Sequence, residues 1–224
     1  MNLTEVIILI NEIEWKTSNN LVEYDFAVSE MKKHVLEIKK NSACEMIWLL
    51  EHNSIFTAGT SAKLEDLKNS NVNFLYTGRG GQWTWHGPGQ RVVYLMLNLK
   101  NRLQDVKAYV YALEELIILS LKDFCINGIR ISGQPGVWVK DNNECNKIAS
   151  LGIRISSWIT FHGISINVNP DLGEFKNIVP CGIKNSGVTS FYKLGKKISL
   201  KELDISLKKN FHKVFGSEGL FKLK

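Results

Sequence analysis

The sequence lacks the features that mark secreted proteins, membrane-spanning proteins and proteins stabilised by a structural metal. Its four cysteines form no C-x-x-C pair and indicate neither a zinc site nor a disulfide framework. No stretch approaches the roughly 20 apolar residues that a membrane helix requires. The N-terminus carries an acidic residue and a short apolar run, where a secretory signal has a basic start and a longer apolar core. We therefore expect a soluble, cytoplasmic protein with reduced thiols.

Internal repeats, low-complexity segments and Pro/Ser-rich linkers are also missing, and only four prolines are present. A chain of 224 residues with 44% hydrophobic content buries a sizeable core without disulfides or metals. The prediction is one domain over residues 1–224.

The formal net charge is +6, but the lysines are scattered and form no dense basic stripe. Nucleic acid is therefore not the expected partner. The charge fits either solvated faces or a surface that attracts an acidic protein partner.

Hydrophobic periodicity alternates between helical and strand spacing along the chain. The predicted helices cover 21–38, 106–124 and 200–215, and the predicted strands cover 46–50, 136–139, 146–155 and 163–169. The strands without a regular βαβ rhythm indicate an α/β (α+β) fold with a mixed sheet flanked by helices. In 163–169, Ser and Asn alternate with apolar residues, so this polar face either meets water or lines a pocket.

The most unusual stretch is 77–90, where five glycines are interleaved with Arg79, Gln82, His86 and Gln90. Its glycines are compatible with a pair of tight turns, whereas the density of hydrogen-bond donors favours a binding site. The stretch contains neither a P-loop nor a dinucleotide fingerprint, so no nucleotide phosphate site is indicated.

Two further residues carry potential chemistry. Cys181 lies between Pro180 and Gly182, and a thiol on such a turn is a nucleophile if a neighbouring ammonium lowers its pKa. Lys147 lies on the predicted hairpin, where a lysine is either an exposed edge charge or such an ammonium. The residues alone do not place one against the other.

Taken together, the motifs resemble the lipoyl(octanoyl) transferase family. The stretch R-G-G-Q-W-T-W-H-G-P-G-Q over 79–90 is similar to the signature loop of that family. Further similar segments follow in order over about residues 20–215: 49–52, 136–139, 147–152, 161–169 and 179–183.

The resemblance implies the fold of the biotin and lipoate protein ligases and a set of site residues. The nucleophile of the family falls on Cys181 and its lysine on Lys147. The implied substrate-binding residues are Arg79, Gly80, Gly81, Gln82, Trp83, Thr84, Trp85, His86, Ser150, Leu151, Gly152, Gly163, Ile164 and Ser165. Trp83 and Trp85 are expected as walls of an acyl slot, and His86 and His162 as residues that position carbonyls or amides.

The resemblance also implies the reaction. Through a Cys181 thioester, an octanoyl group passes from acyl carrier protein to a lysine of lipoyl domains, in 2-oxoacid dehydrogenase complexes and glycine cleavage H protein. The acyl group arrives activated as a thioester, so no metal, nucleotide or redox cofactor is expected. The expected protein is a monomer that binds neither membrane nor nucleic acid.

Two residues depart from the family pattern: Trp85 replaces a common tyrosine, and Cys145 is an extra thiol near Lys147. The alternative enzyme is an ATP-dependent lipoate or biotin ligase on the same fold, which needs no cysteine at position 181. A non-catalytic scaffold that binds a carrier protein is a third interpretation.

Overall fold

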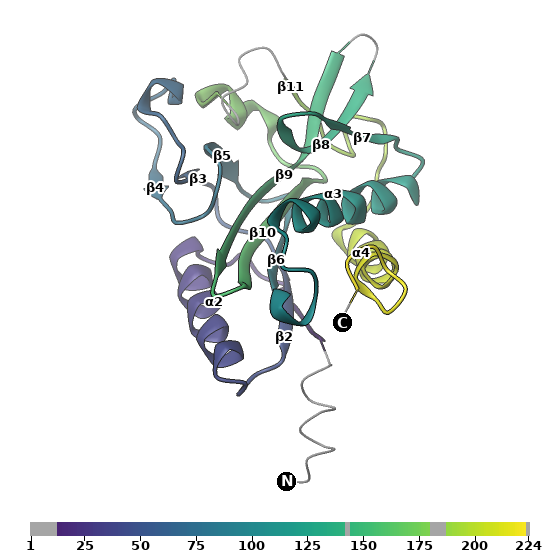
Figure 1. Cartoon of the computed structure of the whole chain (residues 1–224). Coiled ribbons are helices and arrows are strands. Elements are labelled where there is room, and N and C mark those ends of the chain that lie inside the picture. The colour runs from purple at the N-terminus through teal and green to yellow at the C-terminus, as the bar shows by residue number, and fades with distance from the viewer. Residues whose placement is uncertain (1–12, 142–143, 180–186, 223–224) are drawn as a thin grey trace.

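The computed structural model describes residues 13–141, 144–179 and 187–222 (Figure 1). Its main element is an eight-stranded mixed sheet in which seven strands follow the order β1-β2-β6-β10-β9-β8-β7, and β11 pairs with β9. The bounds are β1 Ile13–Thr17, β2 Glu45–Leu50, β6 Gln90–Met96, β7 Gly128–Ile131, β8 Gln134–Asp141, β9 Glu144–Ser156, β10 Ile159–Asn167 and β11 Gly187–Val188. Pairing is antiparallel except for β1–β2 and β9–β11. The mixed sheet predicted from the sequence is confirmed.

Helices cover both faces of this sheet, as Figure 1 shows. Helix α2 (Tyr24–Lys39) lies on one face, and α3 (Val106–Lys122) and α4 (Leu200–Phe215) lie on the other. Strand alternation separates the two cores. From β2 and β6, Trp48 and Val92 pack under α2, whereas Leu49 and Val93 pack against α3 and α4.

The helix starts follow from capping residues. Asp105 accepts hydrogen bonds from two backbone N–H groups at the start of α3. Ser199 and Glu202 form a capping box at the start of α4, which satisfies N–H groups that a helix leaves free. The predicted helices are confirmed, with α2 beginning three residues later than expected at Tyr24.

A second, three-stranded sheet was not predicted. It has the order β4 (Phe74–Tyr76), β3 (Ile55–Ala58), β5 (Trp83–His86). Strand β5 comes from the glycine-rich stretch and pairs with β3. The short 3-10 helix η3 (Leu172–Asn177) adds Phe175 to the apolar cluster of this small sheet.

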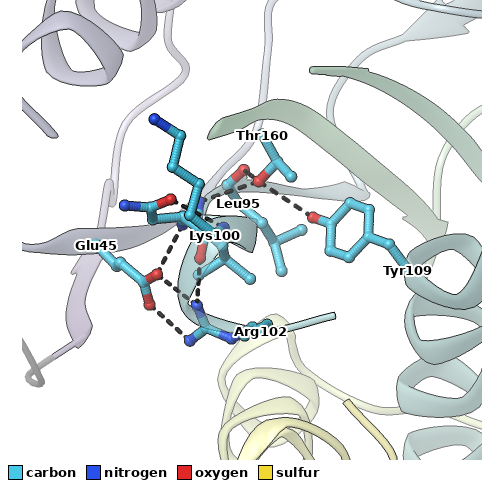
Figure 2. Close-up of polar contacts among 8 residues, drawn as sticks. Glu45, Leu95, Lys100, Arg102, Tyr109 and Thr160 are labelled. Carbon is cyan, nitrogen blue, oxygen red and sulfur yellow. Dashed lines mark hydrogen bonds and ion pairs between the residues drawn. The ribbon is translucent and has the colours of Figure 1, made fainter. Parts of the chain in front are cut away.

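Two buried ion pairs tie distant segments to the main sheet. Arg102 donates through both terminal nitrogens to Glu45 at the start of β2 (Figure 2). On β6, Arg91 Nε lies 2.9 Å from Asp204 Oδ1 of α4. Arg102 is fully buried and Arg91 nearly so.

None of the helices in the described part of the chain is both long and apolar enough to cross a membrane.

Candidate active site

A cavity of about 380 Å³ opens beside the main sheet. Its walls come from loop 79–82, strand β5, the middle of β9 and β10, and the segment between β7 and β8. All the predicted substrate-binding residues except Trp85 line it. Residues 79–86 are thus brought together with 150–152 and 163–165, which lie more than 60 residues further along the chain.

Trp85 lies on the opposite side of β5. Its indole packs on Phe175, with ring centroids 5.7 Å apart, and its Nε1 donates to Ser54 Oγ at 3.0 Å. Successive strand residues point to opposite faces, so Thr84 and His86 face the cavity while Trp85 belongs to the core of the small sheet. The indole of Trp83 packs in that same core, against Phe74. The expectation that both residues form walls of an acyl slot is therefore corrected for Trp85, whereas Trp83 also lines the cavity.

The glycine-rich loop is held to β3 by its own arginine and to β9 by a backbone hydrogen bond. The Arg79 guanidinium donates to backbone oxygens of Thr57, Gly80 and Gln82 at 2.7–3.0 Å. Gly80 N–H donates to Ile153 O at 3.0 Å. Much of the guanidinium fork of this expected substrate-binding residue thus fixes the shape of the loop.

Glycines on β9 and β10 leave space for the glycine-rich loop to lie against the main sheet. Gly152 of β9 pairs with Gly163 of β10. A Cβ added at Gly152 would lie 3.0 Å from Arg79 Cδ, closer than ordinary packing allows. Of the two interpretations of the polar face of 163–169, a pocket lining is confirmed, since Ser165 is buried and lines the cavity.

The backbone of His162 adopts a left-handed conformation, with φ +58°. By strand alternation its side chain would lie with Ile164 in the core beneath α3. Instead the imidazole stacks on Phe161, with centroids 5.1 Å apart, and lines the cavity. Such a conformation costs a β-strand residue about 1–3 kcal/mol and is typically retained at functional sites.

Three buried histidines beside the cavity are held neutral. Burial lowers the pKa of His52 to about 4 and that of His162 to about 3. The pKa of His86 is also lowered well below its ordinary value by burial and by the charges of its neighbours. The Arg79 guanidinium further lowers the pKa of both His86 and His162.

These shifts predict a loss of stability in mild acid. The unfolded chain protonates its histidines near pH 6.5, whereas folded His52 and His162 take up protons only near pH 4 and 3. Protons therefore favour the unfolded state as pH falls from 6.5 towards 4. Each histidine contributes up to about 1.4 kcal/mol per pH unit, and urea unfolding at pH 7.0, 6.0 and 5.0 measures this slope.

The control variants for that slope are His162→Asn and His212→Asn. Asparagine tolerates the left-handed backbone of position 162, so the first variant is expected to fold and to lose one histidine's share of the slope. His212 is exposed on α4, and its replacement is expected to leave the slope unchanged. An unchanged slope in His162→Asn would contradict the assignment.

Lys147 is buried, which rules out the exposed edge charge considered above. Only 3% of it is exposed. Its Nζ donates to Pro135 O at 3.0 Å and lies 4.6 Å from the centroid of the Trp138 ring. Pro135 lines the cavity, so the Lys147 ammonium is hydrogen-bonded to a residue of the cavity wall.

Cys181 lies outside the described residues, within the stretch 180–186. The chain on its C-terminal side is described from Gly187, which pairs with Asn146, while Val188 pairs with Lys147. On its N-terminal side, Val179 N–H donates to Asp66 O at 2.7 Å. Six residues after Cys181 along the chain, Gly187 begins strand β11, which pairs with β9 at Lys147.

Other cavity residues were not predicted from the sequence: Tyr24, Ser61, Val92, Tyr94, Val110, Gly133, Pro135, Ile153 and His162 as a lining residue. Val92 and Tyr94 alternate on β6, but residues 92–97 form a continuous apolar run, so no period-two pattern marks the two that face the cavity. Tyr24 and Val110 lie on helices, and nothing in the sequence marks them as neighbours of the cavity.

Comparison with protein families gives a match over residues 23–212 to the lipoyl protein ligase A/B catalytic domain. The chain is 50% identical over 214 residues to the octanoyltransferase of Bartonella quintana, covering 91% of this chain and 87% of that protein. It is 48% identical over 203 residues to the octanoyltransferase of Wolbachia pipientis, covering 90% of this chain and 99% of the relative.

Solved structures share the fold at low sequence identity. The bipartite lipoate protein ligase of Thermoplasma acidophilum matches with a TM-score of 0.64 at 13% identity, over 90% of this chain and 83% of that one. A lipoate-protein ligase A bound with ATP matches with a TM-score of 0.65 at 12% identity, over 89% and 84%. These likenesses confirm the expected ligase-type fold.

Proposed function

This chain belongs to the lipoyl protein ligase A/B catalytic family, and from that premise we propose that it is an octanoyltransferase of protein lipoylation. The single observation that carries the proposal is identity near 50% to octanoyltransferases over nine-tenths of the chain. The substrate is an octanoyl thioester, and the product is an octanoylated lysine on a lipoyl domain.

The cavity suits an eight-carbon acyl chain. Its volume of about 380 Å³ lies at the lower end of the range for small-molecule sites. Val92, Leu151 and Ile164 give it apolar walls, and the nearby histidines are neutral, so an acyl chain meets no buried imidazolium there.

Catalysis in this proposal runs through Cys181 and Lys147. The Lys147 ammonium favours the thiolate of Cys181, whose sulfur attacks the thioester carbonyl of the donor. Backbone N–H groups around Cys181–Gly182 and in 150–152 stabilise the oxyanion. The carbon–sulfur bond to the donor then breaks, and the donor leaves as a thiol with a proton from Lys147.

In the second step a neutral lysine amine of the acceptor attacks the acyl-enzyme. Lys147 takes a proton from this amine, and Cys181 departs as a thiolate. The buried position of Lys147 and the pairing of Val188 with it support this assignment.

The proposed donor is octanoyl-loaded acyl carrier protein, and the proposed acceptors are lipoyl domains of 2-oxoacid dehydrogenase complexes and glycine cleavage H protein. These partners are typically acidic, and a net charge of +6 favours association with them that weakens as salt rises. We place the reaction in the cytoplasm and assign it to a monomer.

The test is intact-mass analysis of the protein mixed with octanoyl-acyl carrier protein in the absence of ATP. We expect a mass increase of one octanoyl group, lost on hydroxylamine treatment and mapped by peptide analysis to Cys181. The second candidate, an ATP-dependent ligase, is favoured by the fold it shares with a ligase bound with ATP. No adduct without ATP, with product formed only from free octanoate and ATP, would establish that candidate instead.

A further inference from the structure

A buried row of hydrogen bonds runs from the cavity to the strand next to Lys147. His86 Nδ1 lies 2.7 Å from Gln90 Oε1, and Gln90 Nε2 lies 3.0 Å from Asn167 Oδ1. Asn167 Nδ2 in turn lies 3.0 Å from Thr189 O. The four residues are each at most 6% exposed, so water does not compete for these bonds.

The direction of every bond in the row is fixed by backbone carbonyls at its two ends. Thr189 O only accepts, so Asn167 presents its NH₂ group there and its oxygen to Gln90. Gln90 Nε2 donates to that oxygen and also lies 3.3 Å from Trp85 O, a second pure acceptor. Gln90 therefore presents its oxygen to His86, and His86 Nδ1 carries the hydrogen.

This tautomer leaves His86 Nε2 as a bare acceptor. Burial lowers the pKa of His86 well below its ordinary value, so the ring stays neutral. Within the described residues Nε2 has no hydrogen-bond partner, and His86 lines the cavity. An acceptor of this kind attracts an N–H group and repels a carbonyl oxygen.

We propose that Gln90 and Asn167 are positioning residues that lock His86 as a hydrogen-bond acceptor for an N–H group of a substrate. The inference rests on the proposed function, and it narrows the role expected from sequence, since His86 holds an N–H and not a carbonyl. Two N–H sources are available to an acyltransfer from a carrier-protein thioester: an amide in the arm of the donor, and the amine of the acceptor lysine.

The same row steadies the strand beside Lys147. Thr189 N–H donates to Lys147 O at 2.9 Å while Thr189 O accepts from Asn167. The backbone N–H of Thr189 is thereby bonded to the strand of Lys147, and its backbone oxygen is bonded to the row of hydrogen bonds. Gln90 and Asn167 thus connect the acceptor histidine to the strand that carries the proposed proton-transfer group.

The first test is the tautomer itself, read from two-bond ¹⁵N–¹H correlations of the histidine rings in wild type. We expect the Nδ1–H form for His86, and in Gln90→Met a mixture containing Nε2–H. Gln104→Met, an exposed position, is the matched control and should leave the spectrum unchanged. A wild-type ring protonated on Nε2 would overturn the proposal whatever the activity of the protein.

The second test separates the two N–H sources with His86→Phe, which keeps the ring volume and removes the acceptor. Acyl-enzyme formation is measured with S-octanoyl-N-acetylcysteamine and with a simple alkyl octanoyl thioester that has no N–H. If the donor amide is bound, wild type prefers the first by about tenfold and the variant loses the preference. If the acceptor amine is bound, the preference is unchanged and transfer from acyl-enzyme to a lipoyl domain slows by about tenfold.

Equal rates in both half-reactions for wild type and His86→Phe would refute the proposal. Gln90→Glu offers a second route if Gln90→Met unfolds, because it keeps the size and the oxygen facing His86 but loses the donor to Asn167. Failure of the proposed function is distinguishable, since it shows as a wild type without acyl adduct, whereas the tautomer is observed independently.

Discussion

Replacing Lys147 with methionine is expected to lower kcat/KM for octanoyl transfer by about 10²–10⁴-fold, the usual contribution of positioned proton transfer. Methionine fills a similar volume against Trp138 but removes the charge and the proton. The residue is 97% buried, and among the described residues its ammonium bonds to Pro135 O and lies over the Trp138 ring. Steady-state rates with octanoyl-acyl carrier protein and a lipoyl domain measure the effect.

Lys140→Met is the matched control, because Lys140 is exposed on the same hairpin. It should stay within about twofold of wild type. Lys147→Arg separates two roles, since arginine keeps the charge but does not release its proton in proteins. Acyl-enzyme formation that survives in Lys147→Arg while transfer to lysine fails would identify Lys147 as a proton carrier. Full activity in Lys147→Met would remove it from the mechanism.

Arg102→Met is expected to lower the free energy of unfolding by about 3–5 kcal/mol, because it leaves the buried Glu45 carboxylate without its charge partner. Figure 2 shows that Glu45 and Arg102 also make hydrogen bonds to neighbouring residues. Glu45 Oε1 also accepts from Asn98 N at 2.7 Å, and Arg102 donates to Asn98 O at 3.3 Å. Urea unfolding followed by fluorescence measures the change.

Two comparison variants test whether the unpaired Glu45 carboxylate causes the loss of stability. Glu45→Met with Arg102→Met removes both charges and should recover part of the stability. Lys63→Met breaks an exposed pair with Glu65, and should cost about 1 kcal/mol or less. A double variant no more stable than Arg102→Met alone would show that packing, not the unpaired carboxylate, sets the cost.

The elements with clear periodicity were predictable from the sequence, and those defined by tertiary pairing were not. The helix at 200–215 matches α4, because an amphipathic pattern and the Ser199–Glu202 capping box mark it locally. Strand β5 was hidden in the glycine-rich stretch, since its four residues form a strand only by pairing with β3. Short segments of this kind carry too little local information to be separated from turns.

Part of the candidate site was likewise predictable from the sequence, and part was not. The lining residues in 79–84 and 150–152 came from motif resemblance, whereas the left-handed backbone of His162 has no local signature in the sequence. The exposure of Lys147 was open to two interpretations, because its burial depends on Trp138 and Pro135 from the neighbouring strand. The catalytic pairing of Cys181 with Lys147 stays a prediction.

The ion pair between Arg91 and Asp204 has a consequence for how the protein is made. Arg91 belongs to a central strand and is 4% exposed, yet its partner lies 113 residues further along the chain. At ribosomal speeds of about 5–20 residues per second, the Asp204 carboxylate is synthesised roughly 6–23 s after the arginine. Burying an uncompensated guanidinium is costly, so β6 has reason to remain open to water on the nascent chain until α4 has emerged. Completion of the sheet is thereby linked to synthesis of the last helix, and a ribosome-bound chain stalled before residue 204 is expected to be readily cut by protease.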